Sequence, residues 1–96
     1  MDLTTFRSSL ADAESPAGLS LPLQTLWWDA KGDWNRAHAC AQQDEGAMGA
    51  LVHAYLHRKE GDLSNAGYWY RRAGRPVFQG PLEAEWTALV QELLGA

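Results

Sequence analysis

The feature that most constrains the fold is a helix-turn-helix pattern that occurs twice, 29 positions apart. In each copy an apolar helical segment ends at a glycine, an aspartate follows, and an alanine stands four residues after the aspartate. These residues are Gly32-Asp33 with Ala37, and Gly61-Asp62 with Ala66. A glycine readily takes the left-handed conformation that ends a helix, and an aspartate side chain caps the next one. The pattern predicts two helix hairpins, whose helices approach closely at the small alanines.

Other start and stop signals extend this interpretation to the rest of the chain. Ser20 and Asp44 are N-cap residue types, Gly74 follows a helical pattern, and Pro81 is typical of the first position of a helix. No segment shows the sustained alternation of a strand. The sequence therefore predicts an all-α fold of about six helices. Their expected ranges are 3–13, 21–31, 34–43, 45–60, 63–73 and 82–94.

Length and composition favour a single globular domain over residues 1–96. Hydrophobic residues make up 46% of the chain and charged residues 21%, which is typical of a protein with a packed core. The longest apolar run, residues 47–56, is far shorter than the roughly 18 residues of a membrane span. Cys40 is the only cysteine, and the first residues lack the pattern of a signal peptide. These features predict a cytoplasmic protein without a membrane partner.

The charge balance argues against a nucleic-acid partner. The chain has 8 basic and 12 acidic residues, a formal net charge of −4. Nucleic-acid binding depends mainly on neutralising phosphates with lysine and arginine, which an acidic chain opposes. We therefore expect no nucleic acid among the partners.

The second hairpin resembles a known family of helical repeats. Residues 61–63 read Gly-Asp-Leu, and Ala66, Tyr70 and Ala73 follow, which resembles the second half of a tetratricopeptide repeat. Residues 66–73 are also similar to the end of a Sel1-like repeat. The resemblance covers about residues 21–75, with a spacing of 29 residues where a tetratricopeptide unit has about 34.

This resemblance implies a right-handed superhelical array of antiparallel helix hairpins, similar to tetratricopeptide proteins. The two hairpins would be residues 21–43 and 45–74. Stacked repeats need caps on their outer faces, which the helices over 3–13 and 82–94 would supply.

Helix 45–60 has two different faces. Its apolar face consists of Met48, Leu51, Val52, Tyr55 and Leu56. His53, His57 and Glu60 lie together on the opposite side, because they follow a spacing of four and three residues. Gly49 and Ala50 beside them either admit a close helix or leave space for a bound group. In tetratricopeptide proteins the leading helix of each hairpin lines the concave surface, so the resemblance implies that the histidine face lines a groove.

A noncatalytic protein or peptide interaction module is the function this architecture favours, with no cofactor. Helical repeats present extended concave surfaces, and aromatic residues with arginine are common where binding energy concentrates. On helix 63–73, Asn65, Tyr68 and Arg72 share a polar face. The expected partner-binding residues are therefore His53, His57, Glu60, Asn65, Tyr68 and Arg72.

A small metal- or ligand-binding protein is the alternative, and enzymatic acid–base chemistry is open within it. His53, His57 and Glu60 are the candidate metal ligands, with His38 or Tyr68 as additional site residues if the fold brings them near. The H-E-x-x-H pattern of metalloproteases is absent, because Ala54 replaces its glutamate. Cys40 is expected to be a buried, inert thiol. A third hypothesis is a homodimeric structural subunit, in which a partner covers residual apolar surface.

Overall fold

The computed structural model describes residues 1–95, which form six helices and no strand. The helices are α1 (Leu3–Ser9), α2 (Leu21–Ala30), α3 (Trp34–Gln42), α4 (Ala47–Lys59), α5 (Leu63–Ala73) and α6 (Leu82–Gly95). The prediction of an all-α chain with six helices is confirmed. Among the described helices, none has the length and apolar character needed to cross a membrane.

Both glycine-aspartate corners adopt the predicted geometry. Gly32 and Gly61 have φ angles of +84° and +89°, in the left-handed region that favours glycine. The carboxylate of Asp33 accepts a hydrogen bond from the backbone N–H of Arg36 at 3.0 Å, and that of Asp62 accepts one from Asn65 at 3.2 Å. Each corner therefore ends one helix and starts the next within three residues.

Helix α1 is shorter than predicted, ending at Ser9 instead of residue 13. The Nζ of Lys31 donates hydrogen bonds to the carbonyl oxygens of Leu10 and Asp12, at 2.7 and 2.9 Å. In a longer helix the carbonyl of Leu10 would bond within the helix itself. A contact from the residue that follows α2, distant in sequence, therefore holds this segment as a turn.

Helix α4 begins at Ala47, with Gly46 as its N-cap residue, so the predicted cap at Asp44 is wrong. The Asp44 carboxylate instead accepts from the Gly46 N–H at 2.8 Å and forms a turn before the helix. Gly49 is required here, because a Cβ atom at this position would lie 2.3 Å from the Asp44 carbonyl oxygen. The small size of Gly49 thus lets the preceding loop pack closely on α4, and the space holds neither a neighbouring helix nor a bound group.

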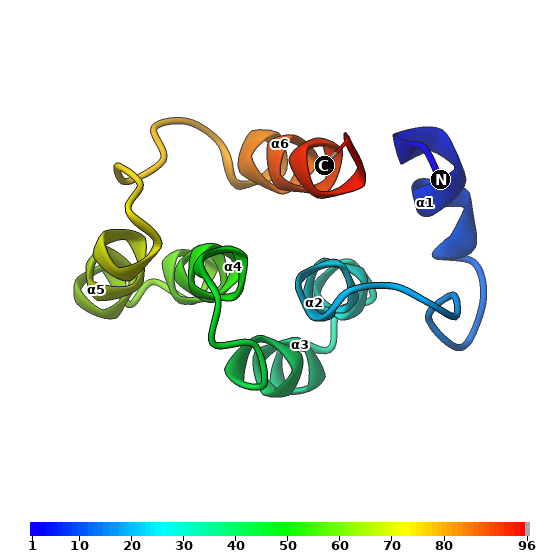
Figure 1. Ribbon diagram of the computed structural model, residues 1–96, viewed down its shortest axis with the longest axis horizontal. Coiled ribbons are helices and arrows are strands. Elements are labelled where there is room, and N and C mark those ends of the chain that lie inside the picture. The colour runs from blue at the N-terminus through cyan, green and yellow to red at the C-terminus, as the bar shows by residue number, and fades with distance from the viewer. Residues whose placement is uncertain (96) are drawn as a thin grey trace.

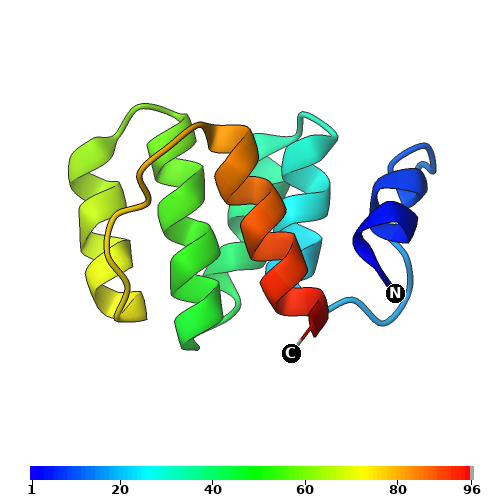
Figure 2. The same cartoon turned by 90° about the horizontal axis from the view of Figure 1, so that it is seen from above.

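The helices form three layers (Figure 1). Helices α5, α4 and α2 lie side by side in the middle row, α6 and α1 lie on one side of it, and α3 lies on the other. Figure 2 shows the hairpin helices running alongside one another, with α6 crossing over α2 and α4. Helix α4 contacts α2, α3, α5 and α6, so it is the central element of the fold.

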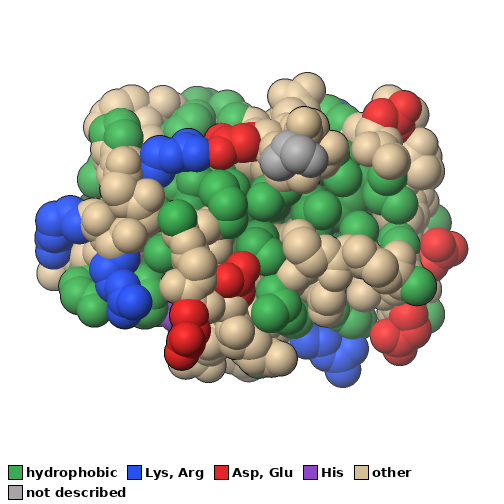
Figure 3. All heavy atoms as spheres, in the orientation of Figure 1, with side chains coloured by type: hydrophobic (Ala, Val, Ile, Leu, Met, Phe, Trp, Pro, Cys, Tyr) green, Lys and Arg blue, Asp and Glu red, His purple; other side chains and the backbone are tan. Residues whose placement is uncertain are grey.

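The core is built around α4, which is buried from Gly49 to His57. Leu51, Val52, Tyr55 and Leu56 join Leu26 and Trp27 of α2 and Trp86, Leu89 and Val90 of α6 in one apolar cluster. Figure 3 shows hydrophobic side chains across the middle of the face that it draws. Each fully buried side chain of this size contributes about 1.5–3 kcal/mol by its removal from water.

Two polar clusters tie neighbouring helices to α4. Asp29 of α2 is buried, and its carboxylate accepts from the Tyr55 hydroxyl at 2.8 Å and from Lys59 Nζ at 2.9 Å. Glu85 of α6 is also buried, and accepts from Arg58 Nη1 at 2.8 Å and from the Tyr70 hydroxyl at 2.5 Å. Each buried carboxylate thus has a cation and a tyrosine as donors, which offsets the cost of removing its charge from water.

Replacement of Glu85 by alanine tests the second cluster. The variant leaves the Arg58 guanidinium and the Tyr70 hydroxyl without their partner, so we expect a loss of about 3–5 kcal/mol in the free energy of unfolding. Urea denaturation followed by circular dichroism measures it. Glu83→Ala, an exposed substitution in the first turn of the same helix, is the control. Equal stability of the two variants would contradict a role for this cluster.

Candidate functional site

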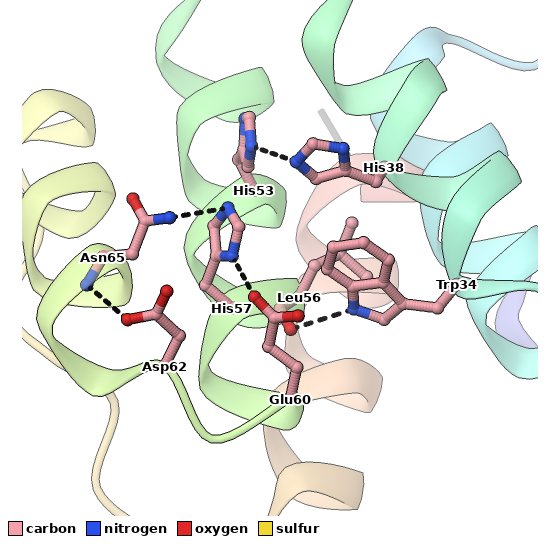
Figure 4. Close-up of polar contacts among 8 residues, drawn as sticks. All are labelled: Trp34, His38, His53, Leu56, His57, Glu60, Asp62 and Asn65. Carbon is pink, nitrogen blue, oxygen red and sulfur yellow. Dashed lines mark hydrogen bonds and ion pairs between the residues drawn. The ribbon is translucent and has the colours of Figure 1, made fainter.

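All three histidines of the chain gather at one place, where α3 and α5 flank α4 (Figure 4). His53 and His57 come from α4, and His38 reaches them from α3. The Nε2 atoms of His38 and His53 are 2.9 Å apart, and one ligand atom from each of the three rings lies within 4.8 Å of the others. The fold therefore unites histidines from two different hairpins.

Local helix chemistry explains why His38 points toward α4. Trp34 and His38 stand four residues apart, so they share one face of α3. Their rings stack with centroids 4.8 Å apart and planes inclined by 11°. The indole Nε1 of Trp34 donates to the carbonyl oxygen of Leu56 at 3.1 Å, which anchors this face of α3 on α4.

On the other side, Trp69 of α5 stacks on His53. The ring centroids are 3.9 Å apart and the planes are inclined by 12°. Trp34 and Trp69 are both half-buried, so they form the outer walls of the histidine cluster. The imidazole of His53 is thus the surface that Trp69 covers.

The His53 and His57 side chains are buried, with 4% and 6% of their surface exposed. The resemblance implied that this face of α4 lines a groove, but α3, α5 and the two tryptophans cover it. Only a trace of histidine surface shows on the face of the molecule drawn in Figure 3. The rings therefore offer little area to a peptide, and their hydrogen-bonding nitrogen atoms face other side chains of the cluster.

Burial keeps two of the histidines neutral. Removal from water, together with the neighbouring His38 and His57 rings, lowers the pKa of His53 from 6.5 to about 4. Burial is also the main cause of the lowered pKa of His38, to which His57 adds. A neutral imidazole has one nitrogen with a free lone pair, which is the form that binds a metal ion.

Glu60 and Asn65 determine how His57 presents its ring. Nδ1 of His57 lies 2.7 Å from Oε1 of Glu60, and Nε2 lies 3.4 Å from Nδ2 of Asn65. Because a carboxylate only accepts and an amide nitrogen only donates, His57 carries its proton on Nδ1. Its Nε2 lone pair therefore faces Asn65, as the dashed contacts of Figure 4 show.

The six residues predicted to bind a partner separate into two groups. His53, His57, Glu60 and Asn65 come together at the cluster. Tyr68 and Arg72 lie on the exposed side of α5, where Arg72 Nη1 donates to the Tyr68 hydroxyl at 3.4 Å. The predicted metal candidates His53, His57 and Glu60 are adjacent, but Glu60 contacts the Nδ1 edge of His57 and does not join the three-histidine group.

From the sequence, His38 had only a conditional place in the site and Trp34 had none. Their spacing of four residues was the available signal, because it places an indole and an imidazole on one helix face. Cys40 is buried as expected, and burial raises the pKa of its thiol. The second group of possible ligands is His57, Glu60 and Asp62, but Asp62 already caps α5.

The neutral state of His53 predicts a stability that depends on pH. In the unfolded chain this ring binds a proton near pH 6.5, whereas in the folded protein it does so only near pH 4. Between these values the unfolded state binds more protons, so the contribution present above pH 6.5 is lost as the pH falls toward 4.

Urea denaturation in chelator at pH 7, 6 and 5 should show the free energy of unfolding falling by up to about 1.4 kcal/mol per pH unit for each such ring. His53→Gln should reduce this slope. An unchanged slope in the variant would show that His53 is not the titrating group.

Comparison with known proteins assigns no family to this site. No protein-family model matches the chain, and neither does any curated protein or solved structure. The similarity to tetratricopeptide repeats therefore stays a prediction from residues 21–75. What the site does must be inferred from the chemistry of its own side chains.

Proposed function

We propose that this protein binds a divalent transition metal ion, with zinc as the expected ion, through the imidazoles of His38, His53 and His57. The observation that carries the proposal is that one ligand atom of each ring lies within 4.8 Å of the others. Imidazole nitrogen is a preferred ligand of zinc, copper and nickel ions. Three histidine ligands are a common protein contribution to a zinc site.

The separations of the ring nitrogens are close to what a tetrahedral ion requires. With Zn–N bonds of about 2.0–2.1 Å, two ligand nitrogens stand roughly 3.3 Å apart. The Nε2 atoms of His38 and His53 are 2.9 Å apart, and the remaining separations stay within 4.8 Å. Shifts of about one ångström in the side chains, with a rotation of the His57 ring out of its stack on His53, would direct all three nitrogens at one ion.

The surroundings of the rings support metal binding more than peptide binding. A carboxylate that accepts from the far nitrogen of a ligating histidine is a recurrent partner in metal sites, and Glu60 stands in that position on His57. The burial of His53 and His57 removes most of the surface that a peptide groove would need. Binding of a protein through Tyr68 and Arg72 stays a prediction from sequence, as does a homodimer.

We further propose that the two hairpins form a tetratricopeptide-like array, with the ion linking them. His38 belongs to the hairpin of α2 and α3, whereas His53 and His57 belong to that of α4 and α5. A metal that binds the folded protein alone stabilises it, by about 2.7 kcal/mol when its concentration is 100 times the Kd.

Zinc titration of chelator-treated protein without a histidine tag tests the proposal. We expect one ion per chain by calorimetry, and a rise of roughly 10–20 °C in Tm at saturating zinc. His38→Gln should lower the zinc affinity by more than the 10- to 100-fold typical of losing an outer partner. Cys40→Ser is the control and should bind as the wild type does. Absence of stoichiometric binding would refute the proposed function.

A second variant tests the role of Glu60 in orienting His57. Glu60→Ala removes the acceptor that holds the proton on Nδ1, so we expect zinc affinity to fall by about 10- to 100-fold. Glu14→Ala, which removes an exposed carboxylate from the loop after α1, controls for the change in net charge. If the two variants bind zinc equally, the Glu60 contact does not support the site.

A further inference from the structure

We infer, on the basis of the proposed metal binding, that the bound ion keeps one coordination position for an exchangeable small anion or water molecule. The position would lie beside the side-chain amide of Asn65. This assigns to the site a class of external ligand, and distinguishes it from a closed structural site, in which the protein supplies all four ligands.

Three imidazoles are the histidine, cysteine or carboxylate ligands that the described residues bring together at the cluster. Among residues 1–95, no fourth histidine, cysteine or carboxylate places a ligand atom within 4.8 Å of all three imidazole nitrogens. Glu60 is the carboxylate nearest to His57 in sequence, but it is hydrogen-bonded to Nδ1 of that ring. Since zinc in proteins is four-coordinate or higher, the fourth position is open to a ligand from solution.

Part of the cluster reaches solvent. His38 and Asn65 are half-buried, although His53 and His57 lie beneath them. Helices α3 and α5 flank the cluster without contacting each other, so between them the rings are covered by side chains and not by a third helix. The half-buried Trp34 and Trp69 form walls on either side, as their stacking on His38 and His53 requires.

Asn65 gains a free donor when the ion binds. In the structure its Nδ2 lies 3.4 Å from Nε2 of His57, whose lone pair accepts the N–H. Coordination of a metal ion uses that same lone pair of His57, so the Asn65 amide loses its acceptor and moves aside when the ion binds. The N–H is then available to an atom of the external ligand on the ion.

Charge determines the chemical class of this ligand. Three neutral imidazoles leave a divalent ion with its full charge of +2, and such an ion favours an anion in the remaining position. The polar neighbour, Asn65, is a hydrogen-bond donor. Together they favour a small anion with lone pairs for both the metal and the amide, such as azide or a carboxylate.

Cobalt(II) replaces zinc in this test, because its visible absorption bands report the ligands of the ion. We expect azide titration of the cobalt-loaded wild-type protein to shift these bands in a saturable way. Bands that are present but unchanged by azide would show a closed site and overturn the inference, with metal binding intact. Absence of cobalt bands would instead indicate failure of the proposed function, and with it of this inference.

Asn65→Asp supplies the missing ligand from the protein. Its carboxylate would take the place of an amide that lies 3.4 Å from a coordinating nitrogen, and aspartate is well tolerated in the first turn of a helix. We expect cobalt to bind this variant with loss of the azide response. Asn35→Asp, an exposed change of the same kind on α3, should retain the response. A full azide response in Asn65→Asp would contradict the assigned position of the external ligand.

Discussion

The structure depends on covering both faces of α4. This helix has almost no solvent-exposed side between Gly49 and His57, so each face requires a partner of matching chemistry. Its apolar face packs on α2 and α6, where removal of hydrocarbon from water supplies the stabilisation. Its histidine face cannot be covered by aliphatic residues alone, because unpaired imidazole nitrogens are costly to bury. Aromatic rings and neighbouring nitrogens from α3 and α5 meet that requirement.

The same helix also explains the two buried carboxylates. Asp29 and Glu85 come from helices on different sides of α4, and each meets a cation that α4 provides. Lys59 and Arg58 are consecutive, so their side chains diverge from the helix toward different neighbours. One turn of α4 therefore orients both α2 and α6. Polar pairing of this kind has directional geometry, which apolar packing lacks.

Features that depend on neighbouring residues in sequence could be predicted. The corners at Gly32 and Gly61 need only a left-handed residue followed by a capping side chain, so local chemistry determines them. The end of α1 could not be predicted, because Lys31, at the C-terminal end of α2, holds it from a distant part of the sequence. The start of α4 shifted by two residues, since Asp44 caps a turn instead of a helix.

The site shows the same division between local and distant information. The helical spacing correctly placed His53 and His57 on one face of their helix. Periodicity alone would expose such a polar face to solvent, and it does not predict which other helix covers that face. The contribution of His38 arises only when the second hairpin packs on the first. Tyr68 and Arg72 share a face with Asn65 by spacing, yet only Asn65, nearer the start of α5, reaches the histidines.

The stacking of indole rings on imidazoles has an optical consequence. Two of the five tryptophans, Trp34 and Trp69, lie directly on histidines of the cluster, whereas Trp27 and Trp86 are in the apolar core. Any change in the electronic state of those imidazoles alters the surroundings of an indole ring, which is naturally fluorescent, at the distance of ring contact. The intrinsic fluorescence of Trp34 and Trp69 therefore reports on the histidine cluster from both of its sides.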